Sequence, residues 1–250
     1  MSVAAVRESR PKPAPAGAYD RVFYGGLAVA MAIVVFVGFA PTYYLRAFTE
    51  NPITVSGATT LTPLAYLHGA LFTAWVVLFI AQTALIATHR VRIHRRMGVV
   101  GAVLAAAMVA VGIRTAISAA ARGAAPPGAD PLVFLAIPLF DMVLFPIFVI
   151  TALWHRRNRE AHKRLMLLAY VSILTAAVAR VPGVLPYGPL VFFGLTFLVL
   201  VVGIVYDLAS RGRVHPAYIW GGTLLVVSVP LRIFVAGTPA WRGVAQFLTK

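Results

Sequence analysis

Four polar or aromatic side chains recur at seven-residue intervals within one apolar stretch of the chain. His68, Trp75, Gln82 and His89 fall on nearly one side of a helix, because seven residues complete two turns less about 20°. In a membrane helix such a stripe is expected to face the bundle interior, where it either hydrogen-bonds to other helices or lines a ligand site. The drift between successive members places His89 at the lipid headgroups.

A second group of ionisable residues lies inside stretches that are otherwise apolar. Asp141 is well inside one such stretch, and Arg114, Arg180 and Arg232 lie near the ends of three others. An ionisable side chain in the hydrocarbon of a bilayer is costly, so each is a candidate functional residue. Together with His68 they predict one of three arrangements: a clamp between Asp141 and an arginine, a cavity for an anionic, quinone-like or propionate-bearing ligand, or a proton relay through Asp141.

The stretches that carry these residues are long enough to cross a bilayer. Hydrophobic residues make up 60% of the 250-residue chain and charged residues 12%, and a spanning helix needs about 20 mostly apolar residues. We therefore predict an all-α polytopic membrane bundle with seven transmembrane helices. Their expected ranges are 22–41, 62–88, 96–118, 131–154, 164–181, 188–207 and 216–236.

The distribution of Lys and Arg predicts the orientation of this bundle. Fifteen of them lie in the N-terminal tail and near residues 90, 160 and 212, whereas four lie in the loops and tail of the other side. Because basic loops stay in the cytoplasm, we expect a cytoplasmic N-terminus and an external C-terminus. The net charge of +15 thus predicts contact with anionic lipid headgroups rather than nucleic acid. Residues 1–20 are expected to form a disordered cytoplasmic tail, and residues 21–250 a single transmembrane domain.

Several classes of site are excluded by composition or by missing motifs. The chain has no cysteine, which excludes iron–sulfur clusters, thiolate-bound metals and haem attached through a CxxCH motif. It also lacks the HExxH, GxSxG, P-loop and GxGxxG patterns. Of the six histidines, five fall at the expected cytoplasmic ends of helices. Whether the protein is an enzyme stays open at this point, with a non-enzymatic role favoured.

Three histidine-bearing segments resemble bacterial multi-pass membrane proteins of unknown function, which are distantly similar to cytochrome b561-type four-helix haem proteins. The segments are LHGALFTAWVVLFIAQTAL, HRVRIHRRMGVVGAVLA and REAHKRLMLLAYVSILTAAVAR, within residues 62–181. The matching positions are His68, His94 and His162. The resemblance leaves two alternatives: one haem b near the cytoplasmic side, with His94 and His162 as the ligands of its iron, or a scaffold of this kind that has not kept the haem. Because His68 is the only histidine of the external half, a second bis-histidine haem is not expected.

The first functional prediction is therefore a b561-like redox protein of a bacterial inner membrane that binds haem or a quinone at the three matching histidines. The second prediction is a transporter or small-ligand-binding membrane protein that uses Asp141 and the three arginines, together with Trp75 and Gln82. The third is an accessory subunit of a membrane complex. The expected partners are the lipid bilayer, a quinone or another small ligand, and other membrane subunits.

Overall fold

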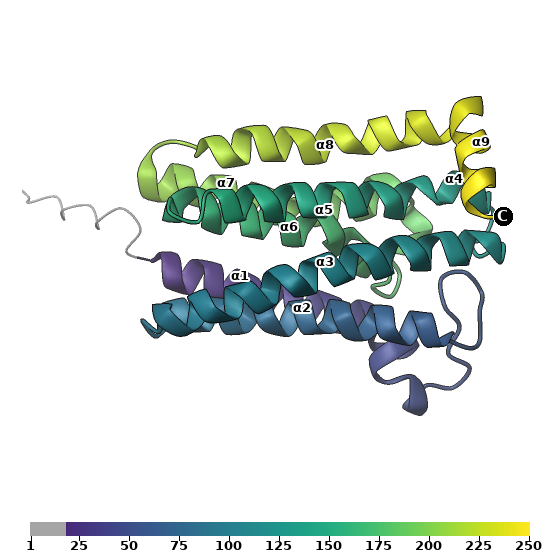
Figure 1. Ribbon diagram of the computed structural model, residues 1–250, viewed down its shortest axis with the longest axis horizontal. Coiled ribbons are helices and arrows are strands. Elements are labelled where there is room, and N and C mark those ends of the chain that lie inside the picture. The colour runs from purple at the N-terminus through teal and green to yellow at the C-terminus, as the bar shows by residue number, and fades with distance from the viewer. Residues whose placement is uncertain (1–18) are drawn as a thin grey trace, which may run out of the picture.

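The computed structural model describes residues 19–250, which form a bundle of long, roughly parallel helices (Figure 1). Seven helices are long and apolar enough to cross a membrane, so the all-α class and the predicted number of spans are confirmed. The helices are α1 (Asp20–Phe39), α2 (Pro63–Ala87), α3 (Val91–Ala121), α4 (Pro131–Phe134), α5 (Ala136–Trp154), α6 (Arg159–Val178), α7 (Pro189–Arg211), α8 (Pro216–Ala236) and α9 (Pro239–Leu248). The expected tail, residues 1–20, lies outside the described residues except for its last two.

The two ends of the bundle carry different loops (Figure 1). The N-terminal face is formed by the start of α1 and by residues 88–90, 155–158 and 212–215. The opposite face is formed by residues 45–62, 122–130 and 179–188 together with α9. Every basic loop of the expected cytoplasmic side that is described therefore lies at the N-terminal face.

Capping residues explain where most of the helices begin. Proline is the first residue of α2, α7, α8 and α9, where its missing N–H costs no helical hydrogen bond. Thr62, Asn158, His215 and Thr238 precede α2, α6, α8 and α9, and each side chain accepts a hydrogen bond from the first turn. Asn158 starts α6 five residues before the expected boundary at 164.

Three other expected boundaries need correction. The predicted range 96–118 is too short, because α3 extends from Val91 to Ala121 and includes the basic residues that precede Arg96. The range 188–207 extends to Arg211, where Gly212 ends α7 with φ of +68°. The range 131–154 is interrupted at Leu135, because Pro138 has no N–H to donate to the carbonyl of Phe134, four residues earlier.

Helix α6 is the central helix of the bundle. In the most apolar 18-residue stretch of α6, 72% of the residues are buried, whereas the corresponding stretch of any other span is at most 44% buried. It packs against α1, α5, α7 and α8, while α2 and α3 pack on each other and extend the bundle through α1 and α5. The α2–α3 pair also reaches α6 directly, since the Phe79 ring lies 5.0 Å from that of Tyr170.

The outer surface of the bundle is apolar. Large hydrophobic side chains point outward from most spans, among them Val103, Ile150, Leu198 and Phe234. A soluble protein would bury side chains of this kind, whereas lipid tails solvate them. The surface therefore supports the description of the chain as a multi-pass membrane protein.

Candidate functional site

Five buried polar atoms have no hydrogen-bond partner among residues 19–250. They are His68 Nδ1, Trp75 Nε1, Gln82 Oε1, His94 Nδ1 and Tyr170 OH. Buried polar atoms are almost always paired, and one without a partner costs about 1–3 kcal/mol. Three of them lie along α2, one on α3 and one on α6, and we take these side chains as the candidate site. We call these five residues and His162 the polar seam.

The seam follows the seven-residue stripe of α2. His68 lies toward the opposite face, Trp75 at mid-depth and Gln82 toward the N-terminal face, so the prediction that this stripe faces the bundle interior is confirmed. His89 leaves the interior as the drift predicts: its side chain is exposed, and its Nε2 lies 2.7 Å from Arg21 Nη1.

Aromatic packing fixes the orientation of the seam residues. Trp75 meets the ring of Phe145 edge-on at 5.0 Å, and Tyr170 meets Phe79 edge-on at 5.0 Å. His68 stacks on Phe72 with ring centres 4.1 Å apart. These contacts hold the apolar parts of the side chains, while the polar atoms of the same side chains have no hydrogen-bond partner among the described residues.

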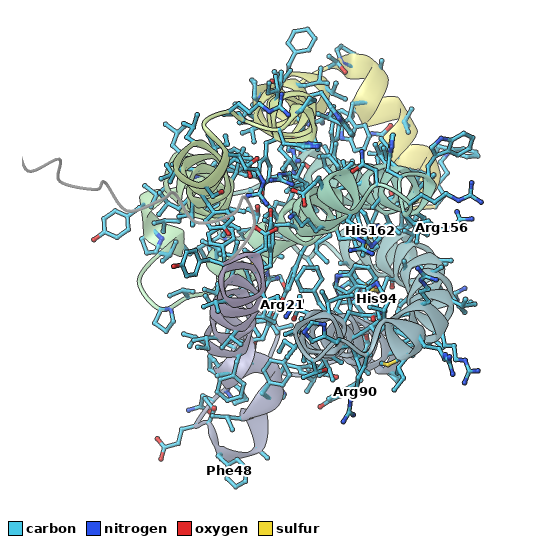
Figure 2. The ribbon with its side chains drawn as sticks, turned by 90° about the vertical axis from the view of Figure 1, so that its left-hand side faces the viewer. Arg21, Phe48, Arg90, His94, Arg156 and His162 are labelled. Atoms are coloured by element: carbon cyan, nitrogen blue, oxygen red, sulfur yellow. The ribbon has the colours of Figure 1, made fainter. Side chains whose placement is uncertain are left out.

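The N-terminal end of the seam brings two histidines together. The rings of His94 on α3 and His162 on α6 have centres 6.3 Å apart and are nearly perpendicular, and Figure 2 shows them side by side in a view from the N-terminal face. Gln82 Nε2 donates to the backbone carbonyl of His94 over 3.3 Å, which ties α2 to the same place.

The tautomer of His162 follows from its hydrogen bond. Its Nδ1 lies 2.8 Å from the backbone carbonyl oxygen of Ala152 on α5. A carbonyl only accepts, so Nδ1 carries the proton and Nε2 keeps a free lone pair. Histidines that bind metals are commonly oriented by such a second hydrogen bond.

The number of nearby ligands limits the metal sites that the two histidines could form. No group of three His, Asp or Glu side chains suited to a metal ion occurs in the described part of the chain. A haem needs only axial protein ligands, because its macrocycle supplies the other four. The rings of His94 and His162 have centres 6.3 Å apart, so the two residues together could hold a metal ion whose other ligands come from a cofactor.

Asp141 lies in the other half of the bundle and is paired with an arginine, as predicted. Arg232 Nη1 on α8 donates to Asp141 Oδ1 on α5 over 2.7 Å, and both residues are buried. Arg232 also donates to the hydroxyl of Ser228 over 3.0 Å. The pair joins α5 to α8, which is the clamp arrangement; a ligand role for these two residues stays a prediction.

The other two arginines lie in different surroundings. Arg114 on α3 is exposed. Arg180 follows the end of α6, donates to the carbonyl of Ala176 over 2.6 Å and lies 4.9 Å from the ring centre of Phe39. The predicted ionisable residues of this half therefore do not form one site. Asp141 and Arg232 are paired, Arg114 is exposed, and Arg180 has separate surroundings.

An ionic network at the N-terminal face was missed by the sequence analysis. Arg164 Nε donates to Asp207 Oδ2 over 2.8 Å, and both side chains are completely buried. Around this pair are four further charged residues from α1, α6 and α7: Asp20, Glu160, Lys163 and Arg211. The available signal was the position of Asp20, Glu160 and Asp207, three of only seven acidic residues, beside clusters of basic ones.

Comparison with family models, curated proteins and solved structures gives no match to this chain. Arguments about its function therefore rest on its own residues.

Proposed function

We propose that this protein is a b561-like haem-binding redox protein of a bacterial inner membrane, with its N-terminal face in the cytoplasm. The observation that supports the proposal is the pairing of His94 and His162 across α3 and α6, with ring centres 6.3 Å apart. One ring has a fixed tautomer, and no third protein ligand accompanies the pair in the described residues. A macrocycle-bound metal suits such a pair better than a free ion.

The residues around the pair have compatible roles. Haem would supply one-electron redox chemistry. His162 would present Nε2 while Ala152 holds its Nδ1–H, and Gln82 would keep the start of α3 in place. A Cβ on Gly98, one turn after His94, would be in ordinary contact with Gln82 Nε2 at 3.9 Å. Trp75 and Tyr170 would offer hydrogen-bond donors along the seam and exclude water from it. A lipid-soluble quinone is the electron partner that the proposal implies.

A reduced-minus-oxidised visible spectrum of the purified, full-length protein tests the proposal. We expect a b-type band in the wild type after expression with added haem precursor, and its loss in His94→Ala and in His162→Ala, because each removes one axial ligand. His155→Ala is the matched control, since His155 is an exposed histidine at the same face. This control should keep the wild-type band.

Two results would contradict the proposal. A wild-type protein that shows no b-type band after incubation with haem is not a haem protein. A wild-type band that persists in both alanine variants removes His94 and His162 from the ligand positions. Size-exclusion profiles of the variants distinguish a lost ligand from a misfolded bundle.

A second candidate function is the binding or transport of a small ligand at the opposite face. One specific observation favours it: Arg180 lines a pocket of about 390 Å³ and has no acidic partner in the described chain.

A further inference from the structure

Arg180 is half-buried and, unlike the buried Arg164 and Arg232, has no acidic partner among residues 19–250. Arg164 is paired with Asp207 and Arg232 with Asp141, but no Asp or Glu among residues 19–250 forms an ion pair with Arg180. Its contacts are the carbonyl of Ala176 and the face of the Phe39 ring. Burial lowers the pKa of Arg180 to about 10 because the guanidinium loses hydration. It still carries its charge at neutral pH.

This guanidinium borders a pocket at the opposite face. The pocket has a volume of about 390 Å³ and lies between the end of α1, the loop after it, Pro127 and the segment that follows α6. Ile53, Val55 and Leu185 give it apolar walls, and Thr42 adds a hydroxyl-bearing side chain. A pocket of this size falls at the lower end of the range for small-molecule sites, roughly 300–1,000 Å³.

The end of α1 is shaped by two local features. Gly38 brings α1 so close to α6 that a Cβ there would lie 2.2 Å from the carbonyl oxygen of Ala177. Immediately afterwards the chain forms a π-helical turn, Ala40–Tyr44, which contributes Pro41 and Thr42 to the pocket. Such turns occur frequently at functional sites. Gly38 itself lines the pocket, so the close contact of α1 with α6 lies at the pocket wall.

We propose that the Arg180 pocket binds the carboxylate of a small amphiphilic acid. The guanidinium fork matches a carboxylate with two parallel hydrogen bonds, and the bound anion supplies the counter-ion that the protein does not. The apolar walls accept the body of the acid. A fatty acid from the bilayer and a free organic acid from the aqueous phase share this chemistry. The proposal is independent of the haem proposal, because the His94–His162 pair lies at the other end of the bundle.

Ligand-induced thermal stabilisation of the full chain in nanodiscs of zwitterionic lipid tests the proposal. We expect octanoate to raise the melting temperature of the wild type, and octanamide, its uncharged counterpart, to leave it unchanged. Arg180→Gln should weaken octanoate binding on the order of 10- to 100-fold, because charge-assisted hydrogen bonds are lost. Arg122→Gln is the matched control, since Arg122 is an exposed arginine at the same face, and it should respond like the wild type.

A second variant guards against misfolding of Arg180→Gln. Ile53 is 57% exposed in the loop that borders the pocket, so Ile53→Trp should fill the pocket without disturbing a helix. It should abolish the octanoate response while Arg180 stays in place. Stabilisation by benzoate as well as octanoate would assign the ligand to the aqueous phase, and stabilisation by octanoate alone would assign it to the bilayer.

Three outcomes would overturn the proposal. The first is equal stabilisation by octanoate and octanamide, and the second is an unchanged octanoate response in both Arg180→Gln and Ile53→Trp. The third is an Arg180-dependent stabilisation by nanodiscs containing phosphatidylglycerol with no response to either acid, because the ligand would then be a phosphate.

Discussion

At the residue scale, this protein treats buried charges and buried neutral polar groups differently. Asp141 and Asp207 each face an arginine at hydrogen-bond distance, as expected for charges removed from water. Five side-chain atoms of the polar seam have no hydrogen-bond partner among residues 19–250. Since the buried carboxylates are paired, these five atoms are not explained by generally loose packing. They are explained if the seam accommodates a ligand or ordered water.

His215 gives a prediction about pH at this scale. Its Nδ1 accepts from the N–H of Ala217 over 3.1 Å and caps α8. Burial first, and the charge of Arg164 second, lower the pKa of His215 below its ordinary value of 6.5. The unfolded chain therefore binds the proton more readily, and stability should fall as the pH drops below the ordinary value. Protonation also removes the capping acceptor, which is worth about 1 kcal/mol.

The measurement is the melting temperature of the purified protein between pH 7.5 and pH 5. Asparagine keeps a capping oxygen but does not titrate, so His215→Asn should lose less stability on acidification than the wild type. His155→Asn, at an exposed position of the same face, should follow the wild type. Equal pH dependence in all three proteins would show that His215 does not contribute.

The sequence predicts the part of the candidate site that one helix determines. A seven-residue period is sufficient to place His68, Trp75 and Gln82 on the interior side of α2, whatever packs against them. Tyr170 and Asp207 were not predicted, because their importance depends on which helix lies opposite. A single tyrosine, or a single aspartate near the end of a helix, forms no repeating pattern in the sequence. The partners Phe79 and Arg164 are separated from them by 91 and 43 residues.

At the element scale, the most polar span is also the most buried one. Helix α6 carries Glu160, Lys163 and Arg164 in its first turns, yet 72% of its apolar window is buried. A helix surrounded by protein on all sides can satisfy polar side chains with neighbouring helices, whereas a lipid-facing helix cannot. Hydrophobicity along the sequence identifies spans but not the central helix, because lipid and protein interior are equally apolar.

The contact between α1 and α6 depends on one glycine. A Cβ at Gly38 would lie 2.2 Å from the carbonyl oxygen of Ala177, a backbone atom that cannot rotate away. Gly38→Ala should therefore push the helices apart and destabilise the bundle by about 1–3 kcal/mol or more. Gly25→Ala in the same helix is the control, since a Cβ there meets nothing within 4 Å. It should be neutral or slightly stabilising, because alanine favours a helix more than glycine does.

Thermal unfolding of both variants in the same detergent checks this prediction. If Gly38→Ala and Gly25→Ala have the same melting temperature, α1 and α6 do not approach each other this closely in the protein.

At the scale of the whole molecule, the sequence predicts the number of spans but not the short helix at the end of the chain. Helix α9 is ten residues long and amphipathic, too short to span a bilayer. It is held against α4 by Trp241 Nε1, which donates to the carbonyl of Leu132 over 2.8 Å, and by the ion pair of Arg242 with Asp130. Its exposed Val244 and Phe247 suit a helix in the membrane interface. The two residues of each contact are more than a hundred positions apart in the sequence, so no local sequence pattern predicts these contacts.

The orientation of the bundle is the last prediction, and it decides on which side of the membrane the His94–His162 pair lies. Because the chain has no cysteine, single-cysteine variants report directly on accessibility. Arg157 and Thr60 are exposed in loops of the N-terminal and opposite faces. The excess of Lys and Arg at the N-terminal face predicts that this face is cytoplasmic. In intact cells, a membrane-impermeant maleimide should label Thr60→Cys and spare Arg157→Cys, and inverted vesicles should give the reverse. The cysteine-free wild type controls for background. Labelling of both variants from the same side would contradict an odd number of spans between Thr60 and Arg157. Labelling of Arg157→Cys alone in intact cells would place the histidine pair on the external side.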